Sequence, residues 1–224
     1  MTGGGPRYEP LEEAALTADL VLPPRKQRID EVLRHRTRSL AVVLDRLEDS
    51  FNMAAVLRTS EALGVQDVHV IKNPDVGFKP NQRVTQGCDK WLDVHRHDSA
   101  AQARAALKAA GYRIAVSAVT PEAVSLFDLD FTPKTALVFG NERFGVSADV
   151  LAMADTVFWL PMHGFTRSLN ISAAVSASLT RAVSWRKERL GVEGDLTPDE
   201  LEALRARFLK LSLKQRGRLF GSNP

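Results

Sequence analysis

The sequence has 224 residues, of which 44% are hydrophobic and 25% charged, a composition typical of a globular protein with one sizeable domain and shorter appendages. No segment reaches the roughly 18 consecutive apolar residues of a membrane span, and the N-terminus lacks the basic-then-apolar order of a secretory signal. The single cysteine, Cys88, excludes an internal disulfide and a multi-cysteine zinc site, so we expect a cytoplasmic protein.

The formal net charge is +3, and basic residues gather near both ends of the chain. Residues 25–38 hold six arginines and lysines against two acids, and residues 205–218 hold six with no acid. Two basic segments around a mildly acidic core favour binding of a polyanion such as RNA through its phosphates. A pair of solvated helices would give the same charge pattern.

The first third of the sequence predicts a leader followed by alternating strands and helices. Residues 1–24 are a loose leader with one short helical piece, and residues 25–37 are a basic helix. The apolar run 40–44 has no polar alternation, which is typical of a strand buried on both faces. Asn52 is the expected N-cap of the next helix, and a strand follows at 67–71.

The alternation continues to the C-terminus. Residues 73–90 are irregular, and further strands are predicted at 91–94, 113–118, 136–139 and 157–160. Helices are predicted from the capping box Ser99–Gln102 to Gly111, over 148–154 after Ser147, over 170–190 before Gly191, and from the capping box Thr197–Glu200 onward. The predicted fold class is α/β, with a mostly parallel sheet and helices on both faces.

Several common catalytic motifs are missing from the sequence. It has no G-x-G-x-x-G loop, no P-loop and no G-x-S-x-G elbow, which argues against Rossmann dinucleotide binding, a P-loop NTPase and an α/β-hydrolase. The five histidines are dispersed. His95 and His97 alternate on one predicted strand without a further ligand nearby, so we expect no metal site. Cys88 is expected in a loop, as a bystander and not a nucleophile.

Two segments near the C-terminal end are the most informative. Residues 139–145 and 160–174 each show a buried strand that runs into a glycine-bearing loop and then into the start of a helix. Open α/β sheets bind ligands at the carboxyl ends of their strands, where backbone N–H groups and small residues allow close approach. The two loops therefore predict a cofactor cleft.

These segments and an earlier one resemble, in order, the three motifs of the SpoU (TrmH-type) branch of the SPOUT RNA methyltransferases. Asn52 and Arg58 fit the family's N-x-x-x-x-x-R after a strand, residues 137–147 fit the second motif, and residues 160–172 fit the third. The resemblance spans residues 38–185 and implies transfer of a methyl group from S-adenosylmethionine to a ribose 2′-hydroxyl. It also implies a SPOUT-type deep trefoil knot and a homodimer that packs its knot helices together.

The resemblance assigns roles to individual residues. The implied catalytic residues are Arg58, Asn52, Glu142, Ser168 and Asn170. The implied cofactor-binding residues are Ser117, Phe139, Gly140, Asn141, Glu142, Gly145, Leu160, Pro161, Met162, Ser168 and Leu169. The expected RNA-binding residues are Arg28, Arg34, Arg186, Arg205, Arg207, Lys210 and Lys214.

The role of Arg58 has two readings. Its match in the family has been assigned to activation of the 2′-hydroxyl, but a guanidinium is effectively always protonated, which makes it a poor base. A cationic Arg58 that grips a phosphate and stabilises the developing alkoxide is the safer hypothesis. Asn52 either orients this arginine or caps its helix, and Glu142 either holds Asn52 or positions the nucleotide. Ser168 and Asn170 would shape the active-site loop or cap the last helix.

The layout of the chain favours tRNA as the substrate. We expect residues 1–37 to form the leader and basic helix, residues 38–190 the SPOUT domain, and residues 191–224 a basic helical tail, so that helical arms stand at both ends. Family members that act on ribosomal RNA commonly carry a larger N-terminal domain. The arms therefore favour guanosine 18 in the tRNA D-loop. Ribosomal RNA, another tRNA nucleotide and a non-catalytic RNA-binding module are the alternatives.

Overall fold

The computed structural model describes residues 20–73, 81–166 and 168–220, apart from the side chains of residues 82 and 214–220. The chain divides into two units. The core unit is Thr37–Glu193, and the terminal unit combines the residues up to Arg36 with those from Gly194 onward. The short helical piece expected in the leader lies outside the described residues.

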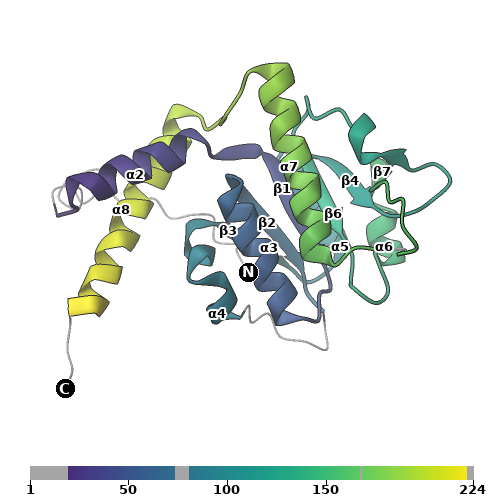
Figure 1. The fold of residues 1–224 in the computed structure, drawn as a ribbon, viewed down its shortest axis with the longest axis horizontal. Coiled ribbons are helices and arrows are strands. Elements are labelled where there is room, and N and C mark those ends of the chain that lie inside the picture. The colour runs from purple at the N-terminus through teal and green to yellow at the C-terminus, as the bar shows by residue number, and fades with distance from the viewer. Residues whose placement is uncertain (1–19, 74–80, 167, 221–224) are drawn as a thin grey trace. The chain divides into compact units, whose positions relative to one another are not determined.

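The described strands of the core unit form one parallel sheet, shown in Figure 1. Its order is β3-β2-β1-β6-β4-β7-β5, and every neighbouring pair is parallel. The strands are β1 (Thr37–Asp45), β2 (Val65–Ile71), β3 (Asp93–His97), β4 (Arg113–Ser117), β5 (Val124–Ser125), β6 (Thr135–Phe139) and β7 (Thr156–Trp159). The α/β class and the parallel sheet predicted from the sequence are confirmed.

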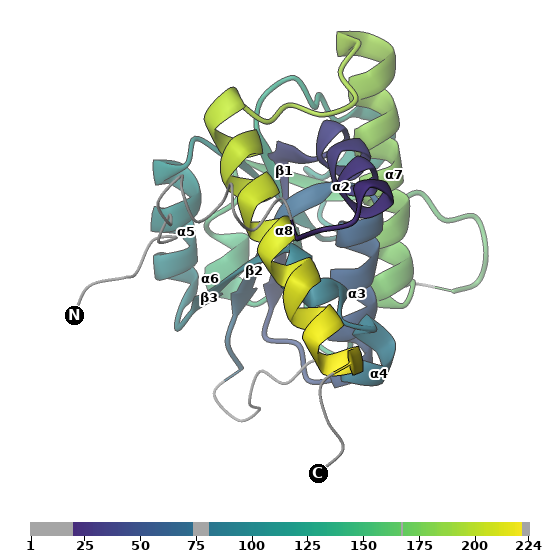
Figure 2. The same ribbon diagram turned by 90° about the vertical axis from the view of Figure 1, so that its left-hand side faces the viewer.

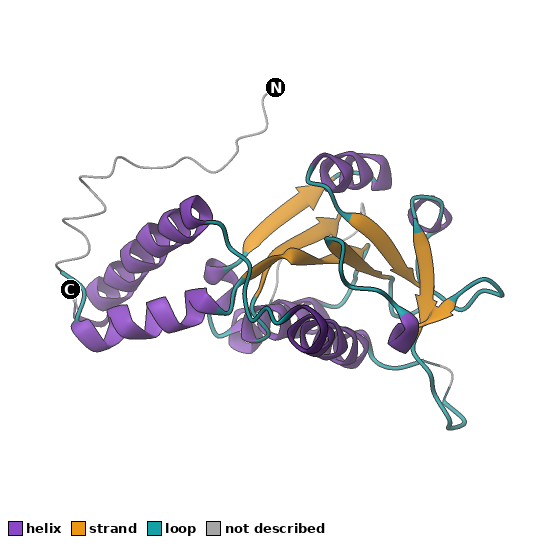
Figure 3. Cartoon of the chain, turned by 90° about the horizontal axis from the view of Figure 1, so that it is seen from above, coloured by secondary structure: helices purple, strands orange, loops and turns teal. Residues whose placement is uncertain are grey.

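Helices cover both faces of this sheet, as Figure 3 shows. Helices α3 (Ser50–Ala62) and α7 (Ile171–Leu190) pack on one face, where Leu44, Val56 and Val175 belong to one buried cluster. The opposite face carries α5 (Ala100–Ala109) and α6 (Ala148–Leu151). Shorter pieces are α4 (Gln82–Thr85) and the 3-10 turns Cys88–Trp91 and Leu126–Asp128. Because strands such as β1 are covered on both sides, their sequences are apolar without alternation.

Several expected helix ends differ in the structure. The cap of α3 is Asp49, whose carboxylate accepts a hydrogen bond from the Phe51 N–H, so the prediction that Asn52 caps this helix was wrong. Asn52 lies in the first turn, where its side chain is available for other contacts. Helix α6 ends at Leu151, earlier than expected, and Ser147 precedes it without a side-chain capping bond.

The segment around Cys88 also differs from the prediction. Cys88 begins a 3-10 turn instead of lying in an irregular loop. Burial, followed by the nearby Glu61 and Asp89 charges, raises the pKa of its thiol to about 11, so it is a weak nucleophile near neutral pH.

In its described residues the terminal unit has two helices, α2 (Pro23–Arg34) and α8 (Pro198–Phe220), which pack together. Figure 2 shows α2 nearly end-on beside α8. The expected capping box begins α8: the Thr197 N–H donates to Glu200 and the Glu200 N–H donates to the Thr197 hydroxyl. Leu33 and Phe208 are buried between the helices. No helix in the described parts of the chain is both long enough and apolar enough to cross a bilayer.

Three histidines that are dispersed in the sequence meet at the β2–β3 edge. His69 and His95 are partners in the parallel register, and their rings stack with centroids 4.4 Å apart. His69 Nδ1 lies 2.9 Å from His97 Nε2, and His95 Nε2 lies 2.8 Å from Asp67 Oδ1. Within the described residues, no group of three or more His, Cys, Asp or Glu side chains is arranged to hold a metal ion.

This histidine cluster predicts a loss of stability in acid. Burial, followed by the neighbouring histidines, lowers the pKa of His69 from 6.5 to about 3, and the pKa of His97 is lowered as well. The unfolded chain therefore takes up a proton first as the pH falls. We expect the free energy of unfolding to drop between pH 6.5 and 3, by about 1.4 kcal/mol per pH unit from His69, and His97 acts in the same direction.

Urea unfolding at several pH values between 7.5 and 4 would measure this effect. His69→Phe keeps a ring in place and removes the titrating group, so its unfolding free energy should depend less on pH than that of the wild type. Equal pH dependence in both proteins would contradict the prediction.

Candidate active site

The three sequence motifs meet at the carboxyl-terminal edge of the sheet through their side chains. Asn52 of α3 donates its Nδ2 to Glu142 Oε1 at 2.8 Å. Asn170, just before α7, donates its Nδ2 to Asn52 Oδ1 at 3.0 Å. Both polar atoms of the Asn52 amide are thus engaged, which fixes its orientation. We call these three residues the amide chain.

Asn170 has a second function as the N-cap of α7. Its Oδ1 accepts from the Ser172 N–H at 2.9 Å and from the Ser172 hydroxyl at 2.6 Å. Capping of this kind satisfies backbone donors that the helix leaves unpaired. The amide chain therefore ties the first turns of α3 and α7 to the loop after β6.

The loop after β6 closes tightly on itself. Asn141 and Gly145 exchange two backbone hydrogen bonds of 2.8 and 2.9 Å. The Asn141 Oδ1 accepts from the backbone N–H groups of Arg143 and Phe144. A Cβ on Gly140 would lie 2.1 Å from the carbonyl carbon of Gly145, so only glycine fits there.

The end of β1 anchors this loop. Asp45 is 1% exposed, and its Oδ2 accepts from both the N–H and the hydroxyl of Ser147 at 2.7 Å. The carbonyl of Arg46 accepts from Asn141 Nδ2 at 3.0 Å, and Arg46 itself has a positive φ of 52°. Sequence reasoning missed Asp45 and Arg46. The signal for Asp45 was its place directly after the apolar run 40–44, because an acid buried there needs hydrogen-bond donors.

Arg58 lies on the exposed surface of α3, six residues after Asn52. Its side chain forms no hydrogen bond or ion pair with the residues that the structure describes. The guanidinium is therefore available for an external anion. It forms no hydrogen bond with the amide chain, so the expectation that Asn52 orients Arg58 has no hydrogen bond to support it.

The expected cofactor residues lie at the ends of three adjacent strands. Ser117 ends β4, Phe139 ends β6, and residues 160–162 follow β7; these strands are neighbours in the order β6-β4-β7. The backbone of residues 162–166 forms no hydrogen bond with other described residues. Ser168 and Leu169 are exposed in the same loop. This edge thus offers free backbone donors and acceptors beside a glycine loop.

Several basic residues expected to bind RNA already have partners within the protein. Arg28 pairs with Glu31 at 2.7 Å, Arg205 pairs with Asp30 at 2.6 Å, and Arg207 lies over the ring of Phe208. Arg186 is 7% exposed and donates to the Phe131 carbonyl, so little of its guanidinium is left for a phosphate. Arg34 is exposed and Lys210 half-buried, whereas the Lys214 side chain lies outside the described residues.

The sequence of this chain matches the model of the SpoU rRNA Methylase family over residues 39–180. The chain belongs to the SpoU methylase family. It is 34% identical over 204 residues to the tRNA (guanosine(18)-2′-O)-methyltransferase of Borreliella burgdorferi, which covers 91% of this chain and 93% of that protein. The enzyme of the same name from Thermus thermophilus is 36% identical over 158 residues, covering 70% and 81% of the two chains.

A solved structure supports the same SpoU assignment. The TrmH/SpoU tRNA-modifying enzyme of Aquifex aeolicus superposes with a TM-score of 0.77 at 31% identity, covering 87% of this chain and 99% of that one. The resemblance predicted from the three motifs is confirmed. Arg58 and the three residues of the amide chain all lie within the matched region, residues 39–180.

Proposed function

We propose that this protein transfers a methyl group from S-adenosylmethionine to the ribose 2′-hydroxyl of guanosine 18 in tRNA. The observation that carries the proposal is the amide chain, which joins the three SpoU motifs at one edge of the sheet. Arg58 lies on the same helix as Asn52 and forms no ion pair with the described residues. The names of the Borreliella and Thermus relatives, which match over most of their length, support this nucleotide.

The residues present fit the cofactor. Backbone groups at 162–166, which form no hydrogen bond with other described residues, can hold an adenine edge or a carboxylate. The Gly140 loop follows β6 at the same edge of the sheet. When bound, S-adenosylmethionine supplies an electrophilic methyl group on a sulfonium. Ser117 and Leu169 are the side chains proposed to flank it.

Arg58 is proposed to act as a cation and not as a base. The transfer exchanges an S–CH₃ bond for an O–CH₃ bond, with S-adenosylhomocysteine as the leaving group. The hydroxyl proton passes to water, so negative charge develops on the ribose oxygen. An exposed guanidinium that has no ion-pair partner in the described part of the chain can stabilise that charge or hold the adjacent phosphate. Glu142 and Asn170 then keep the first turn of α3 in place through Asn52.

Two further features belong to the proposal: a deep trefoil knot at the β6–α7 end of the core unit, and a homodimer through α7. Ala173 and Ala177 are exposed one turn apart on α7, which leaves room for a second helix to approach closely. Ser178, in contrast, is fully buried against its own unit. Sedimentation of the purified protein would test the dimer.

Methyl transfer from labelled S-adenosylmethionine to an unmodified tRNA transcript tests the proposed reaction, with mass mapping of the product. A transcript in which guanosine 18 is replaced and a ribosomal RNA fragment serve as controls. Label at guanosine 18 alone is the expected result. Label only on ribosomal RNA, or at another tRNA nucleotide, would overturn the proposed substrate.

A further inference from the structure

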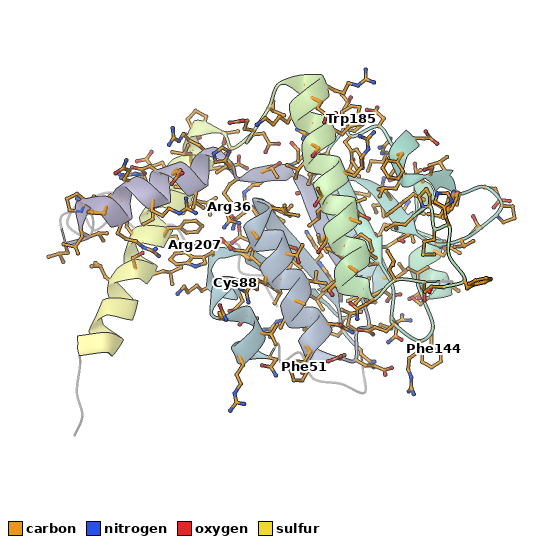
Figure 4. All side chains as sticks on the ribbon, in the orientation of Figure 1. Arg36, Phe51, Cys88, Phe144, Trp185 and Arg207 are labelled. Carbon is orange, nitrogen blue, oxygen red and sulfur yellow. The ribbon has the colours of Figure 1, made fainter. Side chains whose placement is uncertain are left out.

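Each of the three segments joined by the amide chain carries one exposed phenylalanine. Phe51 is 58% exposed, Phe144 80% and Phe165 106%. The remaining described phenylalanines of the core unit, except Phe127, are at most 2% exposed: Phe131, Phe139 and Phe158. Figure 4 shows Phe51 at the start of α3 and Phe144 on the loop after β6, both at the same end of the core unit. Three of the four exposed phenylalanines described in the core unit thus belong to the segments that the amide chain joins.

We propose that these three rings form a stacking surface for the unpaired nucleobases of a single-stranded RNA loop. Every base has a π-face, and aromatic side chains beside a reactive group are the usual platform for unstacked nucleotides. The inference rests on the proposed function and adds the side chains that hold the bases around the reactive nucleotide. A fully paired duplex, whose bases are covered by their neighbours, would not use this surface.

The charged groups near the rings fit a nucleotide. Arg58 and Arg143 are exposed and form no ion pair with described residues, so they can contact phosphates next to stacked bases. The acids next to these rings in the sequence are Glu48 and Asp49 before Phe51 and Glu142 before Phe144. Asp49 already accepts the Phe51 N–H, and Glu142 already accepts from Asn52. Phosphates are therefore placed at the arginines, and the bases at the rings.

A second copy of this chain is the competing occupant. Covering the three rings with a protein surface would also bury the charges of Arg143 and Glu142, which desolvates them at a cost unless each finds a partner. A nucleotide leaves these groups at the wet margin of the contact and provides a phosphate for the arginine. The RNA loop is for this reason the favoured occupant.

Binding measurements separate this inference from the proposed reaction. The probes are a hairpin RNA with an unpaired loop and a fully paired duplex of the same length, both measured with the full-length protein. Phe144→Ala and Phe165→Ala should each weaken binding of the hairpin about fivefold or more, and leave duplex binding unchanged. Phe144→Trp should retain hairpin binding, whereas Phe144→Leu, which keeps apolar volume without a ring, should not.

Phe127→Ala is the matched control, because Phe127 is 59% exposed but lies outside the three motifs, beneath Arg181. It should bind both RNAs like the wild type. Unchanged hairpin affinity in the Phe144 and Phe165 variants, or an equal loss for the duplex, would overturn the inference even if the wild type methylates tRNA. A change of oligomeric state in these variants, seen by sedimentation, would assign the rings to a second copy instead. If the variants lose hairpin binding as expected but the wild type methylates no RNA, only the proposed reaction is contradicted.

Discussion

Replacement of Arg58 by alanine is expected to reduce methyl transfer by at least about 10²–10³-fold while leaving S-adenosylmethionine affinity unchanged. Loss of one group that stabilises developing negative charge has an effect of this size. Arg58 is exposed and has no partner among the described residues, so its removal should not destabilise the fold. Single-turnover transfer to tRNA and calorimetric titration with the cofactor would measure the two quantities.

Two further variants sharpen the test of Arg58. Arg58→Lys keeps the charge and loses the planar pair of donors, so partial activity would assign the role to charge, and full loss would assign it to bidentate contact. Arg104→Ala is the control, since Arg104 is an exposed arginine on α5, on the opposite face of the sheet. A large loss of cofactor affinity in Arg58→Ala would show that the residue serves the cofactor and not the hydroxyl.

Replacement of Gly140 by alanine is expected to abolish cofactor binding and to lower the melting temperature by several degrees. The new Cβ would stand 2.1 Å from the Gly145 carbonyl carbon and 2.2 Å from the Val146 nitrogen. These are backbone atoms of a loop held by Asp45 through Ser147, so they cannot yield as a flexible side chain would. The loop must open, which displaces Glu142 and its hydrogen bond to Asn52.

Gly164→Ala is the steric comparison for Gly140: it adds the same methyl group without a clash, and it keeps the backbone N–H and C=O that are proposed to bind the cofactor. It lies in the neighbouring loop, where an added Cβ would meet nothing nearer than the Thr166 nitrogen at 4.0 Å. Thermal unfolding and binding of S-adenosylhomocysteine should distinguish the two variants: Gly140→Ala should lose melting temperature and affinity, and Gly164→Ala should not. Equal affinity in Gly140→Ala and the wild type would show that the closed form of the loop is not needed for the cofactor.

The sequence predicted the elements that depend on local pattern. The apolar run of β1, the capping box before α8 and the end of α7 at Gly191 follow from burial and capping rules that act over a few residues. It was less accurate at the start of α3, because Asp49 and Asn52 are equally good capping types. The helix begins at Ser50, so the residue before it, Asp49, is the cap.

The basic arms show where charge pattern alone is insufficient. Six basic residues over 205–218 predicted a surface for phosphates. The packed helices use some of that charge internally, since Arg205 pairs with Asp30 from a helix 175 residues earlier. Composition counts charges but not their partners, and the partners come from distant parts of the chain.

The sequence by itself determined the α/β class, the order of the elements and, through three spaced motifs, the SpoU family. From the same motifs it predicted Asn52, Arg58, Glu142 and Asn170 as site residues. Only the tertiary structure decided that Asn52 links Glu142 and Asn170, that Asp45 holds the Gly140 loop, and that dispersed histidines share one edge. Hydrogen bonds between residues about 30 to 120 positions apart depend on strand order and register. Those are set by packing of the whole sheet and not by any local segment.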